Sequence, residues 1–209
     1  MAGVKLSKSG LAEERARLDL CKRTLPSLDL KRRQLTVELA KARRAHQQAE
    51  AAVDALETRI GEEIPMLANP EIEVRGLVKM TAFELDEENV VGVRLPLLRR
   101  VECQVADYSL LARPAWVDLV VDRLKEVAEE RTRLLVLAER VRVLEIHERR
   151  TTQRVNLFEQ ILIPTAKRNI QRIQIFLGDA ERAAVVRSKL AKAKQEKARR
   201  AALSGGAAT

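Results

Sequence analysis

The sequence predicts a mainly α-helical protein. A long N-terminal helix and a long C-terminal helix form an antiparallel two-helix coiled coil, and a small α+β insert containing a hairpin lies between them. Only five of the 209 residues are aromatic, with eight glycines and six prolines, so the residues that fill and turn an all-β fold are scarce. Charged residues make up 33% of the chain beside 46% hydrophobic residues, which is typical of long helices. Apolar residues also recur every seven positions near both ends, as in a coiled coil.

The first long helix is expected over residues 9–64. Ser9 is a suitable N-cap, and the acidic side chains of Glu13 and Glu14 favour the positive end of the helix dipole. Pro26 lacks a backbone N–H and should kink the helix or divide it in two. Two heptad rows run along this segment, interrupted at Arg32 and His46: Leu11, Leu18, Leu25, Leu39, Val53 and Ile60 in one, and Cys21, Leu28, Leu35, Ala42, Ala49 and Leu56 in the other.

Residues 65–113 are expected to form the α+β insert. Glycine, asparagine and two prolines cluster between residues 61 and 70 and should end the first helix. The segment Asn89–Leu95 reads as a strand that ends at Pro96, and Leu98–Val105 reads as its partner strand. About 45 residues are too few to bury a convincing core, so the insert should pack on the helices or on another protein.

The second long helix is expected over residues 114–200, with Pro114 in its first turn. Pro164 interrupts its heptad pattern, which resumes one residue later. Residues 201–209 are expected to be a disordered tail. At 1.5 Å per residue the two helices would extend roughly 80 and 130 Å, too long for a compact globule with a radius of gyration of about 17 Å, so we expect them to pair lengthwise. Twelve apolar residues are assigned to the coiled-coil seam: Leu11, Leu18, Leu25, Leu28, Leu35, Leu39, Val53, Leu56, Leu134, Val141, Val155 and Phe158.

The residues that carry catalysis or bind cofactors are missing from the sequence. No Gly-rich phosphate loop occurs, and His46 and His147 lie on different predicted helices without a metal-binding HExxH motif. Cys21 and Cys103 fit no ligand spacing and are expected to be reduced thiols. We therefore expect a non-catalytic chain with no cofactor and no metal. The absence of a long apolar stretch and of a signal peptide predicts a cytoplasmic protein that does not span the membrane.

The segment Arg187–Arg200 carries seven Lys or Arg residues against one acid, Glu196. It can bind phosphate groups or an acidic protein surface. Alternatively, it is a solvated helix end whose cations favour the C-terminal end of the dipole. No aromatic residues are interleaved with these cations, which weakens the case for specific nucleic-acid recognition.

Short motifs occur in a fixed order along nearly the whole chain. The first helix contains Lys8-Ser9 and Lys31-Arg32, and the insert contains Gly92-Val93 and Leu95-Pro96. The most specific residues lie in the second helix: Arg154, Val155, Asn156, Glu159, Ile163, Pro164, Ile170 and Ile173. In order and spacing these motifs resemble the D subunit of the V-type and A-type rotary ATPases and ATP synthases. Pro26 and Leu157 depart from the pattern of that family.

The resemblance implies a non-catalytic central rotor shaft that couples ATP synthesis or hydrolysis to proton or sodium translocation. The implied partners are the catalytic and regulatory ring subunits, the small F subunit of the stalk, and a funnel subunit that joins the membrane ring, with no nucleic acid. The chain would be attached to the cytoplasmic side of the membrane through the complex. The basic end would then contact carboxylates of the ring through Arg187, Lys189, Lys192 and Lys194.

Two alternatives remain open on the charge and the heptads alone. A free-standing basic coiled coil that scaffolds proteins or binds nucleic acid has the same composition, and so does a tRNA-gripping arm of a larger enzyme. Neither explains the residues from Arg154 to Pro164 or the hairpin-containing insert. Nucleic-acid binding should weaken steeply with salt.

Overall fold

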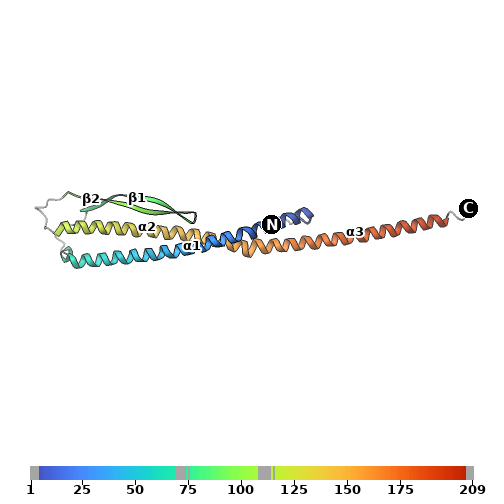
Figure 1. Cartoon of the computed structure of the whole chain (residues 1–209), viewed down its shortest axis with the longest axis horizontal. Helices are drawn as coiled ribbons and strands as arrows, with labels where there is room; N and C mark the ends of the chain where they lie inside the picture. The colour runs from blue at the N-terminus through green and yellow to red at the C-terminus, as the bar shows by residue number, and fades with distance from the viewer. Residues whose placement is uncertain (1–4, 69–73, 75, 108–113, 115, 206–209) are drawn as a thin grey trace. The chain divides into compact units, whose positions relative to one another are not determined.

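In a computed structural model of the 209-residue chain, residues 5–68, 74, 76–107, 114 and 116–205 are described. The predicted fold class is confirmed, because long helices at both ends of the chain enclose an antiparallel hairpin in the sequence (Figure 1). The elements in chain order are helix α1 (Lys8–Glu63), a 3-10 turn (Pro65–Ala68), strands β1 (Val78–Val90) and β2 (Val93–Val105), helix α2 (Trp116–Asn156), a π-helical segment (Leu157–Leu162) and helix α3 (Ile163–Gly205).

Helix α1 begins one residue earlier than expected and is capped by a different serine. The Oγ of Ser7 accepts a hydrogen bond from the backbone N–H of Gly10 at 3.1 Å, the interaction expected of an N-cap residue. Ser9, which we expected to be the cap, lies inside the first turn. The helix continues through Pro26. We expected a kink or a division at that proline, and the division does not occur: its side chain is exposed, and tertiary packing along a long helix can offset the loss of one backbone hydrogen bond.

The chain divides into two units, which we describe separately. One unit consists of residues 1–28 and 154–209, and the other of residues 29–153. In the first unit, Asn169 on α3 donates a hydrogen bond from its Nδ2 to the Oε1 of Glu14 on α1 at 3.2 Å. Cys21, Ala166 and Ile173 are buried in this unit, so small side chains and one large aliphatic side chain contribute to its interior.

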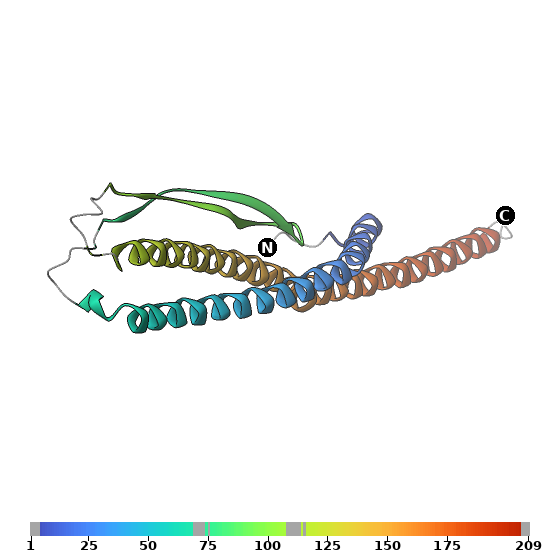
Figure 2. The same cartoon turned by 60° about the vertical axis from the view of Figure 1, so that its left-hand side comes forward.

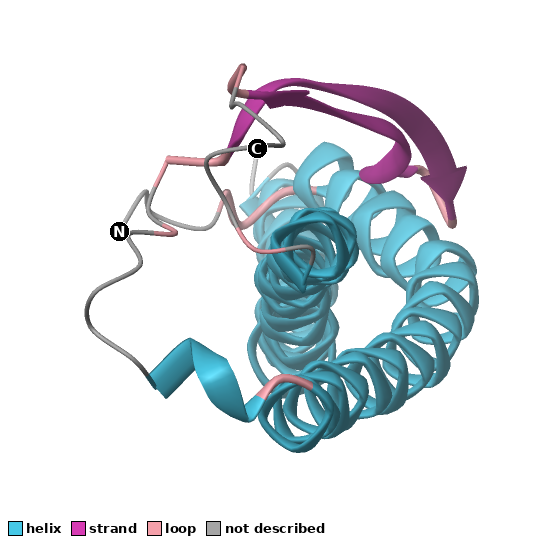
Figure 3. Cartoon of the chain, turned by 90° about the vertical axis from the view of Figure 1, so that its left-hand side faces the viewer, coloured by secondary structure: helices cyan, strands magenta, loops and turns pink. Residues whose placement is uncertain are grey.

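The second unit contains an antiparallel helix pair and the hairpin. Three ion pairs join α1 to α2: Arg123 with Glu63 at 2.9 Å, Arg131 with Glu57 at 2.6 Å, and Arg43 with Glu145 at 2.6 Å. Residue numbers fall along α1 as they rise along α2, so the two helices run antiparallel in a nearly constant register. The hairpin lies alongside α2 in two different views (Figures 1 and 2), and its two strands lie next to each other (Figure 3).

The two strands pair from Val78 with Val105 to Val90 with Val93. Val91 and Gly92 form the turn, with φ angles of 54° and 73°, and positive φ at both central residues is what a type I′ hairpin turn requires. The ladder is irregular between Met80 and Ala82 and again between Glu84 and Leu85. Bulges of this kind bend a strand and re-aim its side chains.

The expected boundaries of the strands were wrong. The segment Asn89–Leu95 is not one strand, because it contains the turn, and Pro96 lies inside β2 opposite Glu87. The partner of β2 is β1, for which no strand was predicted. The turn is poorly signalled, since Val-Gly lacks the Asn or Asp that usually precedes glycine in such turns. Pro96 is compatible with a strand because both strands of a two-stranded sheet are edge strands.

Gly92→Ala should destabilise the protein by about 1 kcal/mol. A Cβ at positive φ approaches the adjacent backbone, whereas the surrounding space is not restrictive, because the nearest atom to a Cβ at Gly92 would be Lys31 Nζ at 3.4 Å. Gly61→Ala is the matched control: Gly61 lies in α1 with nothing within 4 Å of an added Cβ, so alanine should stabilise the helix. Urea unfolding of the two variants checks the opposite signs, and equal effects would contradict the prediction.

Two clusters of buried residues hold the hairpin in the second unit. Leu77, Val117 and Val121 join the start of the hairpin to the start of α2. At the other end, a larger cluster joins the turn region of the hairpin to both helices. Its buried members are Leu35, Leu39, Val93, Leu95 and Leu144.

A π-helical segment explains the displaced heptad pattern ahead of Pro164. The N–H of Ile163 bonds to the carbonyl of Phe158, five residues earlier. This turn therefore accommodates one residue more than a turn of α-helix does. The apolar residues after it consequently continue the heptad pattern one position late. The wider turn also moves the backbone carbonyl that the ring of Pro164 would otherwise contact. Residues 201–205, expected to be disordered, belong to α3, and residues 206–209 lie outside the described part.

Candidate interaction surfaces

None of the twelve residues assigned to the coiled-coil seam is classed as exposed. Leu35, Leu39, Val53, Leu56 and Val155 are buried. The remaining seven are half-buried: Leu11, Leu18, Leu25, Leu28, Leu134, Val141 and Phe158. Other large apolar residues of the same helices, such as Leu20 and Leu30, are 66% and 58% exposed. The seven-residue spacing therefore separates inward from outward apolar side chains.

The residues of the family-like motif divide by side-chain chemistry. Val155 and Ile173 are buried, and Ile163, Pro164 and Ile170 are half-buried. The polar members, Arg154, Asn156 and Glu159, are exposed. The apolar members thus contribute to packing next to the π-helical segment, and the polar members are available for contacts outside the chain.

Sequence reasoning did not predict the contacts that attach the hairpin. Val93, Leu95 and Leu144 are 2%, 1% and 1% exposed, and they meet Leu35 and Leu39 in one cluster. The alternation of Val93 and Leu95 was visible as a strand pattern. Which helix positions they would contact was not, because the contact depends on the position of the turn.

Ion pairs surround the helix pair and the hairpin. A hydrogen bond from the backbone N–H of Glu87 lowers the pKa of Asp86, and the guanidinium of Arg99, 2.7 Å away, lowers it further. A hydrogen bond to Glu126 raises the pKa of Arg123, which also pairs with Glu63 on α1. These groups are at the surface, where each ion pair adds little stability. Their main effect is to determine which residues of neighbouring helices and strands lie opposite one another.

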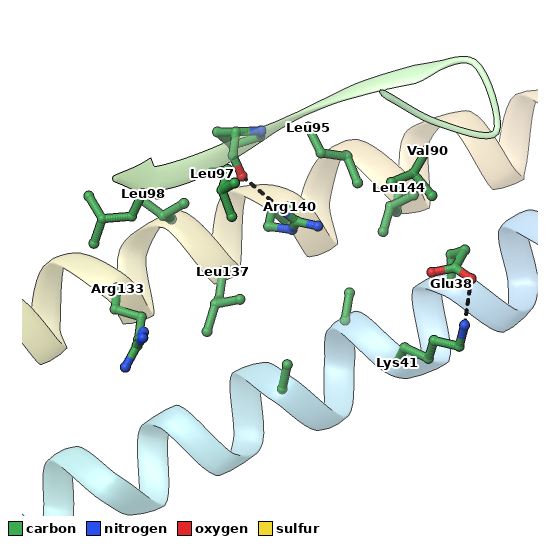
Figure 4. A pocket seen from close by; sticks show the side chains of 14 residues that line it. Glu38, Lys41, Val90, Leu95, Leu97, Leu98, Arg133, Leu137, Arg140 and Leu144 are labelled. Atoms are coloured by element: carbon green, nitrogen blue, oxygen red, sulfur yellow. Dashed lines mark hydrogen bonds and ion pairs between the residues drawn. The ribbon is translucent and has the colours of Figure 1, made fainter. Parts of the chain in front are cut away.

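The hairpin and both helices of the second unit enclose a hollow of about 320 Å³ (Figure 4). Its walls are of mixed polarity: Leu95, Leu97 and Leu98 of β2 and Leu137 and Leu144 of α2 lie beside the charged side chains of Glu38, Lys41 and Arg133. The guanidinium of Arg140 donates to the carbonyl of Pro96 at 3.0 Å and to Glu88 at 2.7 Å. Arg140 is thus paired within the chain.

No group of three or more His, Cys, Asp or Glu residues that could hold a metal ion occurs in the described residues. The same holds for membrane spans: among residues 5–68, 76–107 and 116–205, no helix is long and apolar enough to cross a bilayer. His46 and His147 are half-buried residues of α1 and α2, and Cys21 and Cys103 are free thiols.

The C-terminal part of α3 is an exposed single helix. The hydrogen bond between Glu14 and Asn169 aligns the start of α1 with α3. Helix α1 begins at Lys8, six residues before Glu14, so its first residue lies opposite a residue about six positions after Asn169, near Ile175. Beyond that level α1 offers no partner, and every residue from Glu181 to Arg199 is exposed. Arg187, Lys189, Lys192 and Lys194 all lie in this stretch. The four candidate contact residues are therefore accessible along one unpaired helix.

Long terminal helices with a hairpin between them, an apolar seam and an exposed basic helix end define a coiled-coil protein with a hairpin insert. Comparison with known proteins gives the family. The sequence model of the family described as the D subunit of ATP synthase matches residues 10–193. The chain belongs to this family of ATP synthase D subunits.

Individual relatives match over almost their whole length. The chain is 36% identical over 197 residues to the V-type ATP synthase D subunit of Borreliella burgdorferi, covering 92% of this chain and 95% of the relative. It is 36% identical over 196 residues to the V-type ATP synthase D subunit of Chlamydia muridarum, covering 91% and 95%. The corresponding protein of Chlamydia caviae is 33% identical over 196 residues, covering 91% and 93%.

Proposed function

We propose that this chain is the non-catalytic central rotor shaft of a V/A-type rotary ATPase or ATP synthase. In this role it couples ATP synthesis or hydrolysis in a catalytic hexamer to proton or sodium translocation across the membrane. The observation that carries the proposal is the family match over residues 10–193, reinforced by relatives named as D subunits of V-type ATP synthases that align over more than nine tenths of their length.

A shaft of this kind acts by presenting different faces to equivalent ring interfaces. Each interface is then biased toward a different conformation, because the contacts it makes differ in free energy. The second unit is asymmetric in this sense, since the hairpin lies along one side of α2 (Figures 1 and 2). Such asymmetry supports the proposal, as a chain with equivalent faces would bias all interfaces alike.

The parts of the chain receive separate roles in the proposal. Helix α1 forms the coiled coil with α2 and with the start of α3, and the seam holds these helices together. Residues 65–113 form the insert, which stiffens the shaft or binds the small F subunit of the stalk. A funnel subunit connects the shaft to the membrane ring, so the chain is held at the cytoplasmic side of the membrane without entering it.

The basic end of α3 contacts carboxylates of the ring subunits in this proposal. Its support is the exposure of every residue from Glu181 to Arg199 and the excess of cations there. Opposite charges across an interface raise the association rate and oppose wrong partners. The alternative, a solvated helix end, predicts no effect when these charges change.

The test is assembly of the full-length chain with a complex that lacks it. A variant with Glu at Arg187, Lys189, Lys192 and Lys194 should bind at least about tenfold more weakly than wild type at moderate salt. The control carries Glu at four exposed cations of the other unit: Arg44, Arg59, Lys79 and Arg94. Failure of the wild-type chain to assemble would refute the shaft assignment. Equal binding of the two variants would refute only the role of the basic end.

A further inference from the structure

A groove runs between α1 and α2 on a side that no hairpin residue lines. Its larger hollow, of about 570 Å³, is lined by residues of these two helices alone, among them Leu39, Arg43, Arg142 and Gln153. A smaller hollow of about 240 Å³ continues it and shares Arg43. All lining residues of both hollows belong to the second unit, so the groove is part of one packed body.

The lining of the larger hollow combines an apolar floor with an excess of arginines. Leu39 is 7% exposed and Ile146 is 39% exposed. Four arginines and two glutamates surround them: Arg43, Arg142, Arg149, Arg150, Glu145 and Glu148.

Two of these arginines lack an ionic partner inside the described chain. Arg43 pairs with Glu145 at 2.6 Å, and Arg142 pairs with Glu139, a residue outside the lining, at 2.8 Å. Arg149 and Arg150 are exposed and form no ion pair with any described residue. A guanidinium holds a carboxylate through two parallel hydrogen bonds, which makes arginine well suited to an interface with acidic side chains.

We infer that this groove binds an acidic segment of a protein partner. Carboxylates of the segment pair with Arg149 and Arg150, while apolar side chains between them contact Leu39 and Ile146. The helical spacing supports an extended contact, because Arg142, Arg149 and Gln153 recur at seven and four residues along one side of α2. The apolar floor and the length over two hollows favour a polypeptide over a small anion or a nucleic acid.

This inference rests on the proposed function only in that the partner is sought among the other subunits of the complex. The double variant Arg149→Glu/Arg150→Glu is compared with Arg44→Glu/Lys79→Glu, which makes the same change of charge at exposed residues of the same unit that line neither hollow. The groove variant should assemble with the complex lacking this chain at least about tenfold more weakly than the control variant, and the difference should shrink as salt is raised. Equal far-UV circular dichroism spectra of the two variants would show that both are folded, so that a difference in assembly reports on binding.

A second measurement identifies the occupant. Gln153→p-benzoylphenylalanine places a photo-crosslinker in the groove of the assembled complex. A crosslinked peptide from another subunit with an excess of Asp and Glu supports the inference. A crosslink to a second copy of this chain, to nucleic acid or to a basic or apolar peptide overturns it, and so do equal affinities of the two charge variants. If the wild-type chain does not assemble at all, the proposed function fails first, which keeps the two failures distinguishable.

Discussion

Leu35→Ala will lower the free energy of unfolding of the second unit by about 2–5 kcal/mol, the range for removing a large buried aliphatic side chain. Leu35 is 0% exposed and packs with both the turn end of the hairpin and α2 through the cluster with Val93, Leu95 and Leu144. The surrounding groups come from separate elements, so they cannot close around the missing side chain without moving a whole helix or strand. Urea unfolding followed by circular dichroism measures the loss.

Leu30→Ala is the control for this prediction. Leu30 lies on the same helix five residues earlier and is 58% exposed, so the same substitution should change stability by less than about 0.5 kcal/mol. Hydrogen exchange adds a spatial readout, because the backbone amides of β1 and β2 should exchange faster in Leu35→Ala than in Leu30→Ala. Equal losses in the two variants would show that the cluster does not hold the hairpin.

Deleting Gln160 from the π-helical segment should destabilise the first unit by more than about 3 kcal/mol. The shorter segment would become α-helical, which places the ring of Pro164 against a backbone carbonyl. The deletion removes the additional residue that the wider turn accommodates, so α3 keeps its orientation relative to Val155, which precedes the segment in the same unit. Ala166 and Ile173, which are 3% and 0% exposed, therefore keep their contacts, and the loss comes from the proline. Thermal unfolding monitored by circular dichroism measures the change.

Two variants separate the contributions of the deletion. Deleting Gln195, another exposed glutamine but in the unpaired part of α3, should have little effect, because no packed residue follows it among those described. Pro164→Ala alone should also be well tolerated, since the apolar pattern still requires the additional residue in the segment. A deletion of Gln160 as mild as that of Gln195 would mean that Pro164 does not need the wider turn of the π-helical segment.

The seven-residue pattern picks out some of the helical side chains that turn inward, but it leaves out others, such as Val117 and Val121. Leu35, Leu39, Val53 and Leu56 are buried as their spacing indicates, because helix periodicity is local and is fixed by backbone geometry. The displaced pattern around Pro164 was visible for the same reason. Its cause, a hydrogen bond spanning five residues, could not be distinguished in advance from a kink.

The hairpin was less predictable because its turn is conformationally unusual. Val91 adopts a φ of 54°, a region that β-branched residues rarely occupy, so propensity rules extended the strand through it. The groove between Arg43 and Arg149 was also not foreseen. It depends on the register of two helices about a hundred residues apart in sequence, which ion pairs such as Arg43 with Glu145 and the packing of the helices establish together.

The irregular ladder of the hairpin has a consequence for how the protein behaves at high concentration. A two-stranded sheet has an unpaired edge on each strand, and a long flat edge with apolar side chains can recruit strands from other molecules. Phe83 and Leu85 on β1 are 50% and 49% exposed, so a regular edge there would favour pairing with strands of other molecules. The bulges beside Ala82 and Leu85 and the carboxylates of Asp86 and its acidic neighbours interrupt it. The same irregularities that weaken the ladder therefore protect the molecule from fibril-like self-association.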